Sequence, residues 1–264
     1  MPARAEAASL PPPARPAGPR DRDRATLVVL LLAGGAWLLL WAWTLGGHGH
    51  HGGSADLLGV PRPAAVGLAW LVMVVAMMLP LALGLLGSVR RLVCRRPRPG
   101  LLTALAGAAF LAPWVLSGQL AQAATVALDG LGSLIAETGV PSAALAGAAV
   151  GAIGAFQLSP LKSRSLAACR SPVSFAARRW RGGPSPALDV MRIGGAFGMS
   201  CVACCWGLMA MMLAAGAVGV FVMMPVAAVM VIERLTPWGA AFSRAVGGVL
   251  IVVGASWALL AIAL

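Results

Sequence analysis

The feature that most constrains this chain is a run of forty residues, from Ile193 to Ile232, without one charged side chain. The hydrocarbon core of a bilayer is about 30 Å thick, and about 20 helical residues cross it. The run is therefore long enough for two crossings. The glycines between Ala214 and Gly219 predict the turn that separates them. We expect an integral membrane protein.

The composition agrees with a membrane location. Of the 264 residues, 59% are hydrophobic and 11% are charged, whereas soluble domains carry roughly 25% charged residues. Lys and Arg number 20 against 8 Asp and Glu, a net charge of +12. These basic residues lie in short segments between apolar runs, which is typical of membrane topology. We therefore expect a lipid bilayer as the surroundings and no nucleic acid as a partner.

The apolar runs predict an all-α fold, a polytopic transmembrane bundle of about seven spans. The predicted spans cover residues 26–46, 64–88, 100–119, 141–158, 193–215, 217–233 and 245–264. The sixth is short, so a re-entrant segment is the alternative there. Residues 1–25 are rich in Pro, Ala and Arg and predict a disordered cytoplasmic tail. This division leaves residues 26–264 as the transmembrane helical domain.

The distribution of Arg and Lys predicts the orientation. With seven spans, the tail, the loops at 89–99 and 159–192, and Arg234 with Arg244 all fall on one side, and only Arg62 falls on the other. Because basic loops stay in the cytoplasm, we expect the N-terminus inside and the C-terminus outside. The abundance of Ala, Gly and Arg favours a bacterial plasma (inner) membrane.

Residues 120–137 predict a helix of their own on the outer side. Ala124, Leu128 and Ile135 fall on one helical face, and Asp129 and Ser133 fall on the opposite face. A helix with one apolar and one polar face can lie in the plane of the membrane interface. We expect an interfacial helix here.

Three cysteines within five residues form the most distinctive motif. At 100° per residue, Cys201, Cys204 and Cys205 share one helical face, Met212 continues it, and Met209 borders it. Thiolates and thioethers are soft ligands suited to Cu(I), and thiolates also suit Zn(II). The alternative is a packing seam, because cysteine is a small apolar residue. We predict a metal site here, with copper as the ion and zinc as the alternative.

A methionine stripe in the second predicted span is the second candidate. Met73 and Met77 lie one turn apart, and Met78 follows. Met77 and Met78 are roughly 18–20 Å from the inner boundary at 1.5 Å per residue, and the paired cysteines reach a similar depth. The two groups could face each other near mid-membrane. Such a stripe alone is more often plain helix core.

All the histidines of the chain, His48, His50 and His51, lie in one glycine-rich loop on the predicted outer side. Imidazole binds Cu(II) or Zn(II), so these residues are a candidate external metal loop. A solvated polar turn is the alternative. With no histidine elsewhere, catalysis by a buried histidine base is excluded.

Glu233 ends the sixth predicted span and is followed by Arg234. Acids at membrane depth are expensive to bury, so Glu233 is a candidate gate, and simple pairing with Arg234 is the alternative. Cys94 and Cys169 lie in the predicted basic loops, where nearby arginines favour thiolates that could pass metal on. Incidental thiols are the alternative. Five cysteines is an odd number, which argues against a disulfide framework.

Four stretches resemble the bacterial predicted metal-binding integral membrane proteins, which include copper-chaperone-like proteins associated with maturation of tyrosinase-type copper oxidases. They are Trp70–Pro80, Phe156–Pro172, Cys201–Met209 and Glu233–Gly239, and their order also matches. The chain departs from the family pattern at Ser165, where relatives often carry a cysteine.

This resemblance implies a copper-binding chaperone or transfer protein that supplies a copper-dependent oxidase and is not an enzyme. Two other classes stay open from the residues alone. A membrane thiol oxidoreductase would use the three clustered cysteines, although burial in a low dielectric disfavours their thiolates. A non-catalytic assembly subunit would use the Cys and Met residues only for packing.

Overall fold

The computed structural model describes residues 19–45, 62–136, 141–214 and 220–263, and every regular element in these ranges is helical. The elements are α1 (Pro19–Leu45), α3 (Arg62–Met78), the 3₁₀ turn η1 (Pro80–Ala82), α4 (Leu83–Val93), α5 (Pro99–Ala136), α6 (Ser142–Gln157), α7 (Pro160–Arg170), α8 (Pro172–Arg179), α9 (Pro186–Ala214), α10 (Val220–Leu235) and α11 (Gly239–Ala263).

Four helices of the described chain are long and apolar enough to cross a membrane: α1, α5, α9 and α11. Two bent pairs pass the same test together, α3 with η1 and α4, and α6 with α7, so there are up to six spans if each pair counts as one. Helix α10 has 16 residues, fewer than the about 20 that a straight crossing needs. The all-helical, multi-pass prediction is confirmed at this level.

The predicted helix boundaries agree less well with the structure than the predicted fold class does. Helix α1 begins at Pro19, within the segment predicted as tail, and residues 1–18 lie outside the described residues. The separate interfacial helix predicted at 120–137 is wrong, since α5 runs through this segment as one helix of 38 residues with Pro113 inside it. The amphipathic pattern of this segment does not mark the start of a new helix, because the helix of the apolar stretch continues through it.

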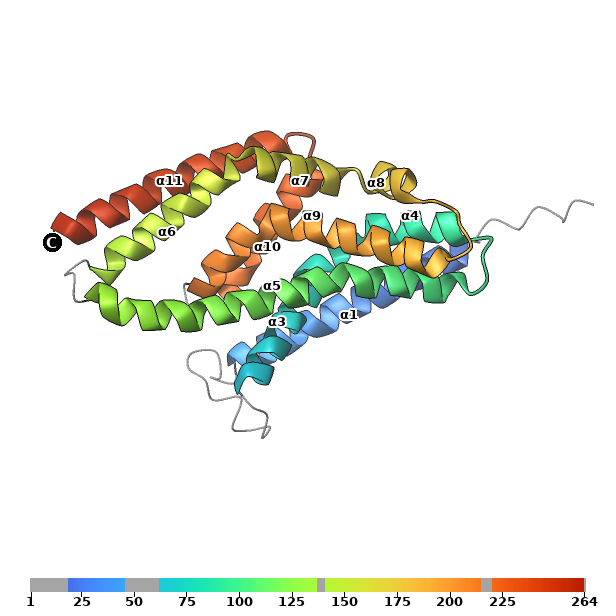
Figure 1. The fold of residues 1–264 in the computed structure, drawn as a ribbon, viewed down its shortest axis with the longest axis horizontal. Coiled ribbons are helices and arrows are strands. Elements are labelled where there is room, and N and C mark those ends of the chain that lie inside the picture. The colour runs from blue at the N-terminus through green and yellow to red at the C-terminus, as the bar shows by residue number, and fades with distance from the viewer. Residues whose placement is uncertain (1–18, 46–61, 137–140, 215–219, 264) are drawn as a thin grey trace, which may run out of the picture.

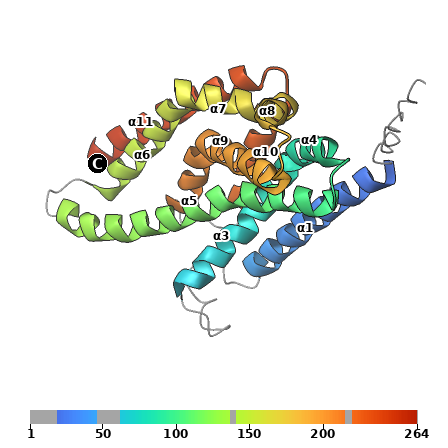
Figure 2. The ribbon, with the colours of Figure 1, turned by 45° about the vertical axis from the view of Figure 1, so that its right-hand side comes forward.

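Helix α9 lies at the centre of the bundle (Figures 1 and 2). It packs most extensively against α5 and next against α7, while α6 pairs with α11 and α1 pairs with α3. Two glycines allow the backbones of α5 and α9 to approach closely. A Cβ added at Gly194 would collide with the carbonyl of Ala106, and one at Gly198 would lie 2.5 Å from the carbonyl oxygen of Phe110. Small residues at such crossings are typical of membrane bundles.

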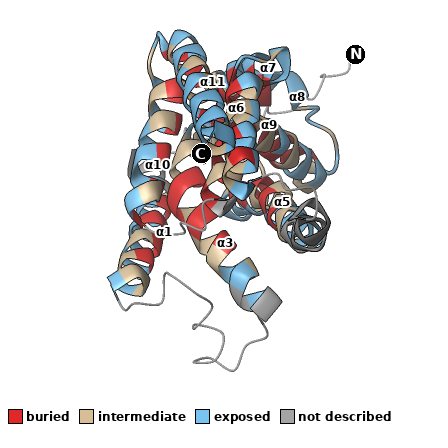
Figure 3. Cartoon of the chain, turned by 90° about the vertical axis from the view of Figure 1, so that its left-hand side faces the viewer, coloured by how far each residue is buried: buried red, intermediate tan, exposed pale blue. Residues whose placement is uncertain are grey.

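Burial falls from this centre outward (Figure 3). The buried core gathers side chains of α3, α4, α5, α9 and α10, with Phe110, Trp114 and Phe197 fully enclosed. The large apolar residues of α1 and α11 are mostly exposed on the protein surface, such as Leu38 and Leu259. A surface of this kind matches lipid rather than water.

The break between α6 and α7 follows from its sequence. Ser159 is the N-cap of α7, its hydroxyl oxygen accepts from the backbone N–H of Lys162 at 3.1 Å, and Pro160 occupies the first helical turn. Both residues favour starting a new helix at this point. The new axis is inclined by 57° to the old one. This bend places Lys162 at the start of α7 and Cys169 at its end, both facing the core.

Candidate metal centre

Four buried thiols meet where α7 packs against α9. Cys201, Cys204 and Cys205 come from α9, and Cys169 comes from the last turn of α7, and all are at most 3% exposed. The Cys169 thiol interacts with those of Cys201 and Cys204, and the Cys205 thiol interacts with the same two. We call Cys169, Cys201, Cys204 and Cys205 the thiol cluster.

The α9 part of the cluster is the face predicted from the sequence. Spacings of three and four residues put the three thiols on one side of the helix, and the structure buries all three. The prediction for Cys169 needs correction. It lies in a helix and is 3% exposed, so it is not a thiol of a solvent-facing basic loop. Cys94, the other cysteine of those loops, is half-buried.

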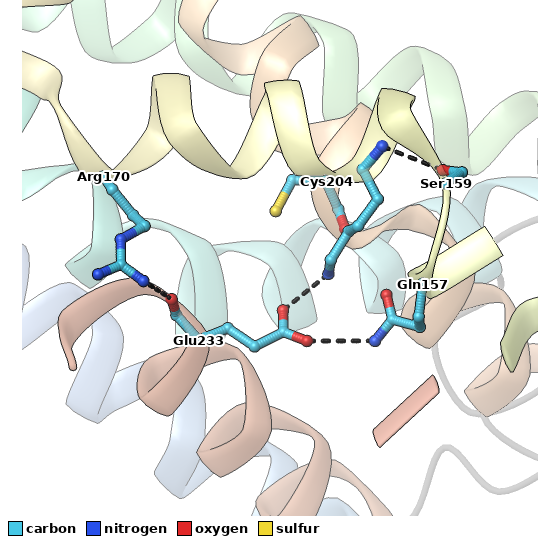
Figure 4. Close-up of polar contacts among 6 residues, drawn as sticks. Gln157, Ser159, Arg170, Cys204 and Glu233 are labelled. Atoms are coloured by element: carbon cyan, nitrogen blue, oxygen red, sulfur yellow. Dashed lines mark hydrogen bonds and ion pairs between the residues drawn. The ribbon is translucent and has the colours of Figure 1, made fainter. Parts of the chain in front are cut away.

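A buried ion pair lies beside the cluster (Figure 4). The Lys162 ammonium donates to Glu233 Oε2 at 2.7 Å and to the backbone carbonyl of Cys204 at 2.7 Å. Lys162 is 1% exposed and Glu233 0%. The alternative pairing of Glu233 with its neighbour Arg234 is therefore wrong. Adjacent residues on a helix point about 100° apart, which lets Glu233 and Arg234 take different partners.

The carboxylate and backbone of Glu233 are held from two sides (Figure 4). The Gln157 amide donates to Glu233 Oε1 at 3.2 Å. The Arg170 guanidinium donates to the backbone carbonyl of Glu233 at 3.1 Å. It also donates to the backbone carbonyls of Thr236 at 2.6 Å and Pro237 at 3.1 Å. Arg170 thus satisfies carbonyls at the C-terminus of α10, where a helix leaves them without intrahelical partners. These bonds fix the end of α10 against α6 and α7.

Arg234 reaches the cluster from the same helix end. Its guanidinium donates to Cys201 Sγ at 3.5 Å, to the carbonyl of Cys169 at 3.4 Å and to the carbonyl of Leu81 at 3.3 Å. Leu81 belongs to η1, the break between α3 and α4. Arg234 therefore links the thiol cluster to the break between α3 and α4. Backbone carbonyls at this break are not part of one continuous helix.

The methionines predicted as ligands are all buried. Met73, Met77 and Met78 lie on α3, and Met209 and Met212 lie on α9. Helix α3 packs mainly against α1 and α5, whereas the main neighbours of α9 are α5 and α7. Their role as ligands stays a prediction.

Other predicted residues fall outside this centre. The loop with His48, His50 and His51 lies outside the described residues. Sequence reasoning missed the buried roles of Lys162, Gln157 and Arg234. The sequence does contain one signal for Lys162. It is the single lysine of the chain and lies at the start of a helix, shortly after a Ser-Pro pair.

The donor set of the cluster suits a soft metal ion. Thiolate sulfur selects Cu(I) and Zn(II), and no carboxylate or imidazole belongs to the four-thiol group. Within the described ranges, no three His, Cys, Asp or Glu side chains are arranged as a ready-formed metal site.

Comparison with known proteins agrees with these chemical features. The fold and the buried thiols define a multi-pass helical membrane protein with a soft-donor centre. Residues 67–257 match the PpoB2 copper chaperone family, and the chain belongs to this family. No curated protein and no solved structure matches the chain. The match covers every helix that contributes to the thiol cluster and the charged groups around it.

Proposed function

We propose that the protein carries Cu(I) on the thiol cluster within the membrane and delivers it to a copper-dependent oxidase. The observation that carries this proposal is the meeting of four buried thiols from two helices. Two or more thiolates match the preference of Cu(I) for soft sulfur, with Zn(II) as the alternative ion. Membership of a copper chaperone family implies a carrier role, so we infer that the protein is not an enzyme.

The buried methionines would provide further sulfur ligands for the copper ion beyond the thiol cluster. Met209 and Met212 follow the cluster along α9 toward the predicted outer side, and Met73, Met77 and Met78 are candidates from α3. Thioethers are neutral and bind Cu(I) more weakly than thiolates do, which suits transfer. Glu233 is the candidate gate, because breaking its pair with Lys162 would free the start of α7 from the end of α10.

The histidine loop would serve the oxidised ion. His48, His50 and His51 lie on the side that we predict to be external, where Cu(II) would be met. Replacing all three with Ala should lower the activity of a partner oxidase when copper is scarce. The copper content of the thiol cluster should stay unchanged when copper is abundant. Complete loss of bound copper in a folded variant would mean that the main site lies in the loop.

We further propose seven spans with the N-terminus inside, in a bacterial plasma membrane. This requires α10 to act as the sixth crossing. Cysteines introduced near His50 should then be labelled by an impermeant maleimide in intact cells. Labelling at this position only after lysis would reverse the topology.

The central test is metal content. The protein is purified in detergent without oxygen, loaded with Cu(I), and analysed for copper. The variant Cys201→Ser/Cys204→Ser/Cys205→Ser should lose the bound copper, while the matched control Cys94→Ser, outside the cluster, should keep it. X-ray absorption on the loaded wild type should show a first shell of sulfur only. A first shell dominated by nitrogen or oxygen would refute the site.

A thiol titration separates the other two classes. A thiol oxidoreductase would cycle between reduced and disulfide forms of the cluster without retaining copper. An assembly subunit would bind no copper and would keep its thiols reduced in every state. Either result would replace the carrier function.

A further inference from the structure

Three charged side chains are buried around the thiol cluster. Lys162 and Arg234 are positive, Glu233 is negative, and all three are at most 6% exposed. Lys162 and Glu233 form an ion pair at 2.7 Å. In the described part of the chain, Arg234 makes no ion pair with a carboxylate. Its positive charge faces the thiols instead, with Cys201 Sγ 3.5 Å from the guanidinium.

Arg234 is directed at the cluster itself. Its guanidinium contacts Cys201 Sγ at 3.5 Å. Its central carbon also lies over the ring of Phe197, 5.8 Å from the ring centroid. Burying a cation is costly unless an anion joins it.

We propose that Arg234 is the fixed counter-cation of the thiol cluster, so that its positive charge stabilises the metal–thiolate complex that forms there. This inference rests on the proposed function. A Cu(I) ion bound by two or more thiolates forms a complex of net negative charge, and the Arg234 guanidinium lies 3.5 Å from Cys201 Sγ, where it can offset that charge.

The setting of Arg234 keeps this charge in place. Two of its donors are engaged by the carbonyls of Leu81 and Cys169, and Arg170 anchors the carbonyl of Glu233, the residue before it. A planar guanidinium can serve several acceptors at once, whereas a lysine ammonium is a flexible point charge. This difference lets the charge of Arg234 be tested separately from its hydrogen bonds.

The test compares Arg234→Met, Arg234→Lys and the wild type by competition for Cu(I) against a chromogenic chelator, without oxygen. Arg234→Met removes the charge and should weaken Cu(I) binding at least about tenfold, or about 1.4 kcal/mol. Arg234→Lys keeps the charge, loses the fork of donors, and should stay within about threefold of the wild type. Arg244→Met, an exposed arginine on α11, is the control for general loss of positive charge and should bind as the wild type does.

Equal weakening in Arg234→Lys and Arg234→Met would overturn the role of the charge, because it would mean that only the donor fork matters. Normal binding by Arg234→Met would overturn it too. If Arg234→Met does not fold, Arg234→Gln, which removes the charge but keeps a polar side chain, replaces it in the comparison.

The proposed function fails in a different way. A wild-type protein that binds no Cu(I) would refute the carrier role whatever the variants do. A wild type that binds Cu(I) with no dependence on the charge at position 234 would refute only the role of Arg234.

Discussion

Helices α9 and α11 are both long and apolar, yet they do opposite things in the fold. In the most apolar stretch of α9, 56% of the residues are buried within the protein. In the most apolar stretch of α11, only 11% are buried. Helix α9 contributes three thiols to the cluster and packs against α5, α6 and α7. Helix α11 pairs mainly with α6 and exposes Val252, Leu259 and Leu260.

The difference shows that hydrophobicity gives membrane residence but not position within the bundle. An apolar side chain is equally satisfied by lipid and by protein, so burial of Leu or Val alone drives no helix to the centre. What holds α9 at the centre is specific: close glycine contacts with α5 and polar bonds from α7 and α10. The bonded atoms have no alternative partner in lipid.

The largest expected effect comes from breaking the ion pair that ties α7 to α10. Lys162→Met leaves Glu233 charged and buried with only Gln157 as a partner. Loss of one member of a buried pair costs about 3–5 kcal/mol. The free energy of unfolding in detergent, from a denaturant titration, checks this value.

Two further variants sharpen that result. Arg164→Met, on the same helix but exposed, should change the free energy by no more than about 0.5 kcal/mol. The double variant Lys162→Met/Glu233→Leu removes both charges and should regain most of the loss. A double variant as unstable as Lys162→Met would show that the ion pair is not the cause.

The next effect concerns the α5–α9 contact. Gly194→Ala would drive a methyl group into the carbonyl of Ala106, whereas the methyl of Gly195→Ala would lie at an ordinary 3.7 Å from the carbonyl of Ala109. Overpacking of this kind costs about 1–3 kcal/mol. Gly194→Ala should therefore lower the free energy of unfolding, whereas Gly195→Ala should not. Equal effects of the two variants would contradict the close approach of these backbones.

Much of the fold could be predicted from the sequence for a clear physical reason. The apolar runs and the Arg/Lys distribution depend on residue type alone, so they reveal the helical membrane class directly. The shared face of Cys201, Cys204 and Cys205 depends only on helical periodicity. These predictions need no knowledge of which helices are neighbours.

The partners of the cluster could not be predicted in the same way. Cys169 and Lys162 join it because the chain bends by 57° after Gln157 and returns α7 against α9. Glu233 pairs with a residue 71 positions away rather than with its neighbour. Such pairings depend on tertiary packing, which local patterns do not encode. The predicted interfacial helix was wrong for a related reason, since an amphipathic pattern does not mark where a helix begins.

The smallest expected effect concerns two neighbouring glycines of α11, Gly247 and Gly248. We expect their replacement by alanine to change the free energy of unfolding in opposite directions. A Cβ at Gly247 would lie 2.9 Å from Cβ of Gln157 and 2.9 Å from the carbonyl oxygen of Gly154, but a Cβ at Gly248 would meet nothing within 4 Å. Gly247→Ala should therefore separate α11 from α6 and lower stability. Gly248→Ala adds a methyl group toward open space and removes the conformational freedom of glycine in the unfolded chain, which is worth roughly 0.5–1 kcal/mol in a helix. We expect its free energy of unfolding to rise slightly, with Cu(I) binding unchanged. A loss of stability in Gly248→Ala would mean that the outer face of α11 is covered by another protein surface and not by lipid, which would remove the contrast with α9.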